Sequence, residues 1–272
     1  MSSVLVFDIE TVPDISAARQ VYDWHDLSDQ DTLAGLSLKR RIETGNDFPK
    51  HFLHQVVAIS AVLKTAEGVK IWSIGDVADD EANLLQRFFD GIGRFQPTLV
   101  SWNGGGFDLP VLHYRALKHG IQAQAYWDMG DFNRERKWHN YISRYQFAHI
   151  DLMDVMAGYQ PRANAKLDEI ALLLGLPGKM GLSGAGVLEQ FQAGDIQGIR
   201  DYCELDVINT YLIYLRFQLM RGWLDPSSYQ ANIDELAELL KSSSHSHWQA
   251  YYQAWHSIQP SKDIKVSAWP EK

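Results

Sequence analysis

Two carboxylates stand two residues apart near the N-terminus, in the segment Phe7-Asp8-Ile9-Glu10-Thr11. An apolar, β-favouring run over residues 3–7 precedes them, and alternate residues of a strand point to the same face. Neighbouring acids repel each other, and burying them is costly unless positive charge intervenes. A hard divalent cation such as Mg²⁺ prefers oxygen ligands and would remove this repulsion. The pair indicates either a metal site or an exposed strand end with solvated acids.

A third acid, Asp108, follows a run of glycines in the segment Ser101-Trp-Asn-Gly-Gly-Gly-Phe-Asp108. The glycines allow the backbone to turn sharply from a strand into a helix. They form neither a phosphate-binding P-loop nor a dinucleotide fingerprint, because Gly-Lys-Ser/Thr and Gly-x-Gly-x-x-Gly are both missing. Asp108 is compatible with a metal ligand and with an N-cap of the following helix, which has Pro110 in its first turn.

Tyr202 and Asp206 form a third pattern, because residues four apart share one face of a helix. Asp206 is flanked by the apolar residues Leu205 and Val207, so we expect it to be buried. A buried aspartate usually has a positive partner or a metal. Glu204 points elsewhere on the helix and is expected at the surface.

In this order the three motifs resemble those of the DEDD superfamily of 3′–5′ exonucleases. The matching patterns are Phe-Asp-Ile-Glu-Thr, then Asn-x₃-Phe-Asp-x-Pro, then Tyr-x₃-Asp. The last pattern is typical of the tyrosine subclass, since Asp201 stands where the histidine subclass has its histidine. The resemblance extends over roughly residues 3–220 and is closest to the proofreading exonuclease domain of family B DNA polymerases. The chain is similar to stand-alone relatives of that domain, without a polymerase part.

The resemblance implies a role for each motif. The four acids would hold two divalent metal ions, Mg²⁺ or Mn²⁺, of which one activates water and the other stabilises the leaving 3′-oxygen. Tyr202 would hydrogen-bond the water rather than deprotonate it, since the ordinary pKa of tyrosine is about 10. The implied metal ligands are Asp8, Glu10, Asp108 and Asp206. The implied contacts to the terminal nucleotide are Asn103, Phe107, Thr11 and Ile9.

The implied reaction is hydrolysis of single-stranded DNA from a 3′-hydroxyl end, releasing nucleoside 5′-monophosphates. An exoribonuclease and a nuclease for very short oligonucleotides remain alternatives within this class. A haloacid-dehalogenase-type phosphatase would use Asp8 as nucleophile, but it leaves Asp108 and Asp206 unexplained. An inactive nucleic-acid-binding module would require the loss of a ligand, and all four are present.

The elements that must position these residues form an α/β pattern. Apolar runs predict five strands, at residues 3–7, 55–63, 68–74, 98–102 and 149–153. Helical spacing predicts five helices, at residues 80–95, 109–118, 167–174, 195–221 and 232–241. Three hairpin-like strands followed by alternating strands and helices predict a ribonuclease-H-like mixed sheet flanked by helices.

The domain organisation is predicted from the segments that break this pattern. We expect an exonuclease domain over residues 1–222, with insertions at about 14–54, which holds helical pieces, and at 121–149. A C-terminal helical extension would cover residues 223–272. The aromatic and basic residues between Trp127 and Tyr145 predict either a stacking platform for single strands or a loop that covers the core. His245 and His247 are expected in a solvated loop.

Composition limits the setting and the partners of the protein. The 272 residues include 46% hydrophobic and 22% charged residues, as in an ordinary globular protein. No apolar run approaches the roughly 20 residues that span a bilayer. The single cysteine, Cys203, excludes an internal disulfide framework, and with no basic leader it favours a cytoplasmic location. A net charge of −9 argues against binding long duplexes but not against processing ends, where bound cations reverse the local potential.

Overall fold

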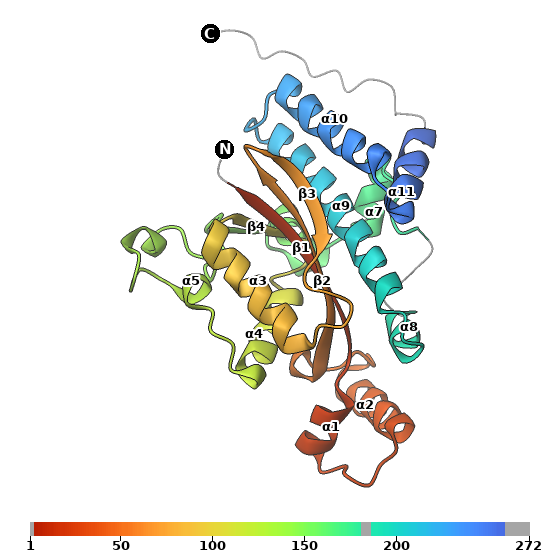
Figure 1. Cartoon of the computed structure of the whole chain (residues 1–272). Helices are drawn as coiled ribbons and strands as arrows, with labels where there is room; N and C mark the ends of the chain where they lie inside the picture. Colours follow the sequence, from red (N-terminus) through yellow and green to blue (C-terminus); the bar gives the residue numbers. More distant parts are fainter. Residues whose placement is uncertain (1–2, 181–185, 259–272) are drawn as a thin grey trace.

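The computed structural model describes residues 3–180 and 186–258, and its centre is a five-stranded mixed sheet (Figure 1). The strand order is β3-β2-β1-β4-β5. The first three strands of the chain pair antiparallel, while β4 and β5 continue the sheet parallel to β1. This arrangement confirms the predicted ribonuclease-H-like sheet. The strands are β1 (Val4–Pro13), β2 (His54–Thr65), β3 (Gly68–Ser73), β4 (Thr98–Ser101) and β5 (His149–Asp151).

Alternation along β1 sends its side chains to two different cores. Leu5 and Phe7 pack with helices α3 (Glu81–Phe95) and α4 (Asp108–His119) on one face of the sheet. Val4 and Val6 pack with helix α9 (Ile196–Met220) on the other face. Because Asp8 and Glu10 have the same parity as Val6, their carboxylates belong on the α9 face.

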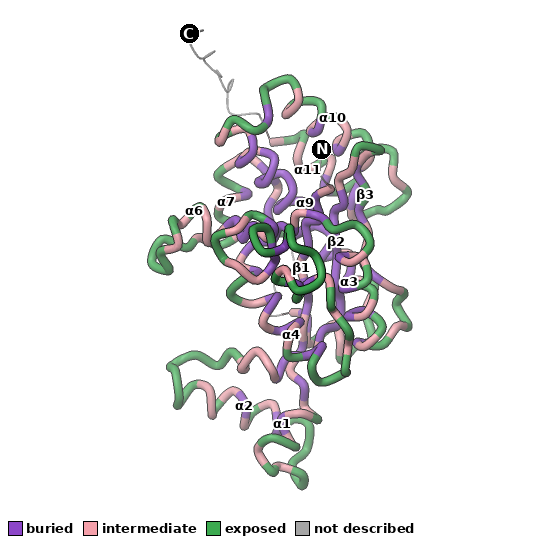
Figure 2. The backbone as a smooth tube through the Cα atoms, turned by 90° about the vertical axis from the view of Figure 1, so that its left-hand side faces the viewer, coloured by how far each residue is buried: buried purple, intermediate pink, exposed green. Residues whose placement is uncertain are grey.

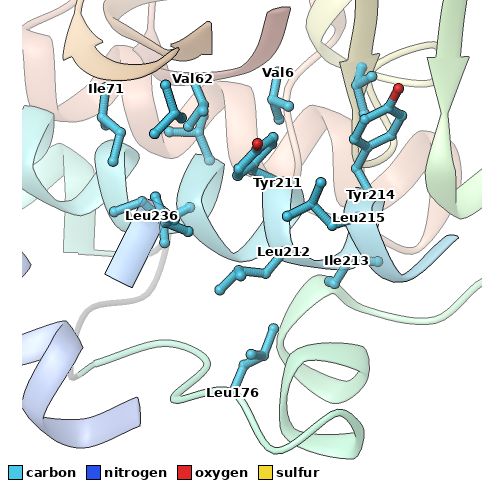
Figure 3. Packing of buried hydrophobic residues seen from close by; sticks show 14 of the residues in the cluster. Val6, Val62, Ile71, Leu176, Tyr211, Leu212, Ile213, Tyr214, Leu215 and Leu236 are labelled. Atoms are coloured by element: carbon cyan, nitrogen blue, oxygen red, sulfur yellow. The ribbon is translucent and has the colours of Figure 1, made fainter. Parts of the chain in front are cut away.

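Helix α9 has buried residues around nearly its whole circumference, because the sheet and other helices pack against it. In Figure 3, Tyr211 and Leu215 of α9 lie beneath Val6 and Val62 of the sheet, and Leu236 lies beneath Ile71. Leu236 belongs to α10 (Pro226–Ser242), which packs on α9 together with α11 (Ser246–Ser257). The remaining short helices after β5 are α6 (Leu152–Met156), η3 (Pro161–Ala163), α7 (Leu167–Leu173) and α8 (Val187–Gln192).

The C-terminal helices differ from the sequence prediction in two ways. Helix α10 begins at Pro226 rather than at residue 232, because Asp225 accepts a hydrogen bond from the Ser228 N–H at 2.7 Å and caps the helix there. His247, predicted in a solvated loop, lies in helix α11, whereas His245 precedes the helix and is exposed, as predicted. Trp248 of α11 lies in the same core as α9. The division at residue 222 stays a prediction.

The two predicted insertions are structured differently. Residues 14–54 contain α1 (Ile15–Tyr22), α2 (Asp29–Thr44) and η1 (His51–Leu53), so the helical pieces expected there are confirmed. These helices lie at one end of the molecule and are largely exposed (Figure 2). Residues 121–149 hold only α5 (Gln124–Trp127), η2 (Arg134–Lys137) and the start of β5. Part of this segment covers the core, where Tyr126 and Tyr141 stack with ring centroids 5.6 Å apart, while Trp138 is exposed.

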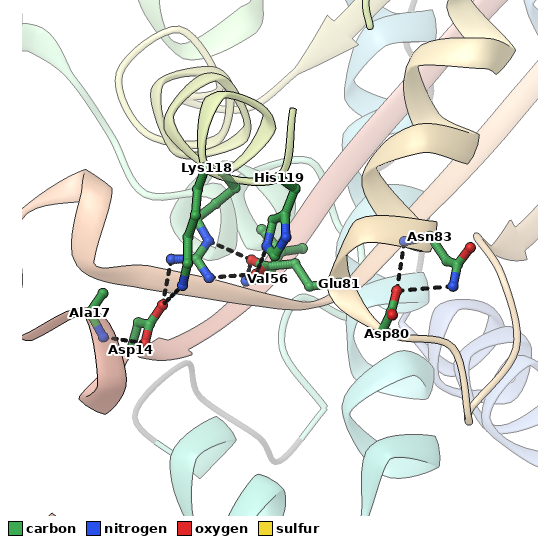
Figure 4. Close-up of polar contacts among 9 residues, drawn as sticks. Asp14, Ala17, Val56, Asp80, Glu81, Asn83, Lys118 and His119 are labelled. Carbon is green, nitrogen blue, oxygen red and sulfur yellow. Dashed lines mark hydrogen bonds and ion pairs between the residues drawn. The ribbon is translucent and has the colours of Figure 1, made fainter. Parts of the chain in front are cut away.

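A buried ion-pair network joins Asp14, the residue that follows β1, to helices α3 and α4 (Figure 4). Arg115 of α4 is only 1% exposed and donates to Asp14 at 2.6 Å and to both oxygens of Glu81 at 2.7 and 2.5 Å. Lys118 and His119 of the same helix bond Asp14 and Glu81 respectively. Burial alone would raise the pKa of Asp14, but hydrogen bonds from Lys118, Ala17 N–H and Arg115 hold it below its usual value. The network fixes α4, which carries Asp108, against the end of β1.

Arg115→Met is therefore expected to destabilise the fold by about 3 kcal/mol, because it removes a buried cation that pairs with two buried carboxylates. Lys118→Met is the matched control, since its side chain is 44% exposed and its ion pair should contribute less than about 1 kcal/mol. Urea unfolding measures both free energies. Equal effects of the two substitutions would contradict this role of Arg115.

Candidate active site

The structure brings the four predicted carboxylates together from three separate elements. Asp8 and Glu10 stand on β1, Asp108 is the first residue of α4, and Asp206 lies in the middle of α9. The Ile9 N–H donates to Asp108 Oδ1 at 3.2 Å, which ties the start of α4 to β1. Glu10, Asp108 and Asp206 are buried, and Asp8 is partly buried. Four carboxylates therefore lie in one site that is largely shielded from solvent.

The N-cap interpretation of Asp108 is wrong. Phe107 occupies the N-cap position and makes no side-chain cap, while the Asp108 carboxylate faces β1 instead. The loop before it is held by Asp151, which accepts from the Asn103 and Gly105 N–H groups at 2.9 Å each. Gly104 is required for this turn, since a Cβ there would lie 2.2 Å from Ser101 Oγ. Asp151 thus fixes the backbone of the glycine loop that leads to Asp108.

Burial and mutual repulsion raise the pKa values of these acids. The pKa of Asp8 is well above its usual value because of burial and the charges of Asp108, Glu10 and Asp206. The pKa of Glu10 is raised by burial and by Asp206, and burial raises that of Asp108 to about 7. Burial also raises the pKa of Asp206.

The charge balance and the donor atoms fit a hard divalent cation. Asp206 Oδ1 is buried and has no hydrogen-bond partner among the residues that the structure describes. A donor set made only of carboxylate oxygens is the set that Mg²⁺ and Mn²⁺ prefer. Positive charge in the site would lower the cost of ionising all four acids.

Lys179 brings positive charge to the site, and the sequence analysis missed it. Its Nζ donates to Tyr202 Oη at 2.6 Å and lies 3.8 Å from Asp206 Oδ2. Its backbone N–H donates to Asp168 of α7 at 2.7 Å, so the lysine is held from both ends. The only local signal is the preceding Gly178, whose φ of +65° marks a tight turn.

Tyr202 stays a neutral phenol in this environment. It is 3% exposed, and burial together with the charges of Asp206 and Glu10 raises its pKa far above the usual value. Lys179 has only donor hydrogens, so Tyr202 Oη accepts from it, while its own hydrogen is directed to Asp206, whose pKa it lowers. Tyr202 is therefore placed to donate a hydrogen bond, not to take a proton.

Cys203 contacts the site as a donor. Its thiol lies 3.5 Å from the Asp8 carbonyl oxygen and 3.7 Å from Asp8 Oδ2. Burial raises the pKa of the thiol well above its usual value, so the S–H is kept and orients Asp8. Although Cys203 clusters with Asp8 and Glu10, a protonated thiol is a poor metal ligand.

Glu204 is buried, contrary to the surface position predicted for it. Its carboxylate accepts from Ser73 Oγ at 2.7 Å and from Trp248 Nε1 at 2.8 Å, and His247 Nε2 lies 2.8 Å away. His247 is likewise packed against α9 and is not in a solvated loop. The reason is that α11 covers the outer side of α9, which no local pattern in the sequence reveals.

A cavity of about 550 Å³ opens beside Glu10. Three of the four residues predicted to contact a terminal nucleotide line it, namely Ile9, Thr11 and Phe107. Asn103 lines a different cavity, of about 610 Å³, on the side of residues 121–149. The first cavity has further walls that the sequence analysis did not assign: Leu33 and Leu36 of α2, Phe48, Pro49, His54 and Leu188 of α8.

Within residues 3–180 and 186–258, no helix is both long and apolar enough to cross a membrane. A stretch of 44 residues, 16% of the chain, is 48% identical to the catalytic subunit of DNA polymerase epsilon from Saccharomyces cerevisiae and covers 2% of that protein. A family B DNA polymerase from the archaeon Pyrobaculum calidifontis aligns with 95% of this chain at a TM-score of 0.47 and 19% identity. The chain spans 30% of that polymerase, so it matches only a small part of either relative.

Residues 46–255 match the family described as a predicted 3′–5′ exonuclease related to the exonuclease domain of PolB. The matched region contains Asp108, Tyr202 and Asp206, and it begins after Asp8 and Glu10. Asp8 and Glu10 nevertheless lie next to the matched region in the structure, because β1 pairs with β2 and the Ile9 N–H contacts Asp108. The chain belongs to this family of predicted 3′–5′ exonucleases related to the PolB exonuclease domain.

Proposed function

We propose that the protein is a 3′–5′ exonuclease that hydrolyses single-stranded DNA from a 3′-hydroxyl end and releases nucleoside 5′-monophosphates. The observation that carries this proposal is the convergence of Asp8, Glu10, Asp108 and Asp206 in a largely buried site with raised pKa values. Lys179 alone does not balance these four charges. We therefore assign the four carboxylates as ligands of two divalent cations, Mg²⁺ or Mn²⁺. Bound cations would activate water and stabilise the leaving oxygen.

The remaining residues of the site orient the reactants. Tyr202 donates its hydrogen to the attacking water beside Asp206 and aligns it, because Lys179 already donates to its oxygen. The Lys179 ammonium adds a fixed positive charge 3.8 Å from Asp206, where negative charge gathers during the reaction. The Cys203 thiol holds Asp8 only while it is reduced, which suits a cytoplasmic protein.

The terminal nucleotide is assigned to the cavity beside Glu10. Its volume of about 550 Å³ suits a small ligand, and Phe107 offers an aromatic face to a base. Asn103, which lines the other cavity, is assigned to the nucleotide before it. A protein of net charge −9 that holds only the last nucleotides needs few phosphate contacts.

The test of this proposal compares termini and topology. With Mg²⁺ or Mn²⁺ present, we expect linear single strands with a 3′-hydroxyl to be shortened one nucleotide at a time. Circular strands of the same sequence should survive, and a 3′-phosphate should slow the reaction at least about tenfold. Matched DNA and RNA oligomers of several lengths then report the sugar and length preference, with Asp8→Asn as the inactive control. Equal loss of circular and linear strands would show an endonuclease instead.

A further inference from the structure

His54 contacts Thr11, and both residues line the cavity beside Glu10. His54 is the first residue of β2 and is 3% exposed, and its Nδ1 lies 2.9 Å from Thr11 Oγ1. Its Nε2 lies 3.3 Å from the carbonyl oxygen of Pro49, in the segment between α2 and η1. One ring therefore connects the insertion at residues 14–54 to the strand that carries Glu10.

These two contacts decide which ring nitrogen carries the hydrogen. A carbonyl oxygen only accepts, so Nε2 must donate to Pro49. Burial lowers the pKa of His54 to about 4, so the ring is neutral near pH 7 and Nδ1 is an acceptor. The rings of Phe48 and Phe107, centred 4.8 and 5.1 Å away, hold the imidazole in this orientation.

The direction of the Thr11 hydroxyl follows from this tautomer. Its single hydrogen is donated to His54 Nδ1, so its remaining lone pairs are the polar feature that Thr11 offers to the cavity. A group that binds there must donate a hydrogen. The neighbouring Glu10, also on the cavity wall, is an acceptor as well when ionised.

We propose that His54 is a positioning residue that makes the Thr11 hydroxyl an acceptor for the terminal 3′-hydroxyl of the substrate. This inference rests on the exonuclease function proposed above. A 3′-hydroxyl can donate to Thr11, whereas a 3′-deoxy end and an ionised 3′-phosphate have no hydrogen to donate there. The His54–Thr11 pair thus selects the chemistry of the terminus, while the carboxylates carry out hydrolysis.

The experiment measures a ratio of kcat/KM values for two single strands of one sequence, ending in 3′-OH or in 3′-H. We expect the wild type to prefer the 3′-OH strand on the order of tenfold, as for one well-placed hydrogen bond. His54→Leu should reduce this ratio to about one to three, because the freed Thr11 hydroxyl no longer has a fixed direction. His54→Asn keeps an acceptor oxygen near the Nδ1 position and should restore most of the ratio.

Two further variants separate this role from a general loss of structure. Thr11→Val should lose the same ratio as His54→Leu, and the double variant should lose no more, since the two residues act as a unit. If His54→Leu does not fold, the ratio measured for Thr11→Val still tests the proposal. His247→Leu is the matched control, because His247 is a mostly buried histidine that lies 2.8 Å from Glu204 and lines neither cavity. It should keep the wild-type ratio.

An unchanged ratio in both His54→Leu and Thr11→Val would overturn the inference. So would a wild type that degrades 3′-OH and 3′-H strands equally fast, although that result leaves the exonuclease function intact. If the wild type degrades neither strand with Mg²⁺ or Mn²⁺, the proposed function itself fails and this inference fails with it.

Discussion

Asp206→Asn is expected to lower the single-turnover rate of hydrolysis by roughly 10³-fold or more, and to raise the melting temperature of the metal-free protein. The substitution keeps the shape of the side chain and removes its charge. The rate is expected to fall because a proposed ligand of the metal site is lost. Stability rises because Asp206 Oδ1 is buried without a partner among the described residues, so the ionised carboxylate opposes folding near neutral pH. Asp8→Asn should behave in the same way.

The pH dependence of stability gives an independent check in EDTA. A carboxyl whose pKa is raised on folding binds more protons in the folded state, so stability is lost as pH rises from the unfolded pKa through the folded pKa. For Asp108 this window runs from about 4, the ordinary value, to about 7. The wild type should therefore melt at a lower temperature at pH 8 than at pH 5. Asp206→Asn should show a smaller difference, because one of the acids with a raised pKa is gone.

Metal binding should reverse this effect in the wild type. Mg²⁺ or Mn²⁺ in excess stabilises the folded state by mass action, so the melting temperature should rise with metal concentration in the wild type and much less in Asp206→Asn. Asp234→Asn, a substitution on α10 and away from the four acids, is the matched control and should retain both rate and metal response. Near-normal metal-dependent turnover in Asp206→Asn or Asp8→Asn would contradict the assignment of these ligands.

Tyr202→Phe is expected to lower the single-turnover rate on the order of 10²-fold while metal affinity and substrate binding stay close to wild type. The ring keeps its packing, and only the hydroxyl is lost. That hydroxyl accepts from Lys179 at 2.6 Å, and its own hydrogen is the one proposed to align water. Because its pKa lies far above the usual value, the phenol keeps its hydrogen near neutral pH.

Tyr211→Phe provides the comparison for Tyr202→Phe on the same helix. Tyr211 is 1% exposed, and its hydroxyl has no hydrogen-bond partner among the described residues. Removing that hydroxyl should leave the rate unchanged and cost no stability. The melting response to Mg²⁺ then reports whether either variant has lost metal. An unchanged rate in Tyr202→Phe would make this tyrosine a packing residue.

Much of the sheet and of the acidic site follows from local patterns in the sequence. A strand repeats every two residues and a helix about every 3.6, so the facing of Asp8 with Glu10 and of Tyr202 with Asp206 can be derived without a structure. The same periodicities predicted β1 through β5 and helix α9, and these elements are confirmed. Asp108 reaches the other acids because the chain turns sharply from β4 into α4. The run of glycines between these two elements predicts that turn.

The contacts between distant segments were decided only by the tertiary structure. Glu204 was predicted at the surface, yet α11 covers it, because both sides of α9 are packed against other elements. Lys179 reaches Tyr202 from a turn 23 residues earlier in the chain, and His54 meets Thr11 across the pairing of β1 with β2. Such partners are set by how elements pack, and no residue spacing encodes them. The sequence by itself determined which residues could do the chemistry, whereas the packing decided which neighbours orient them.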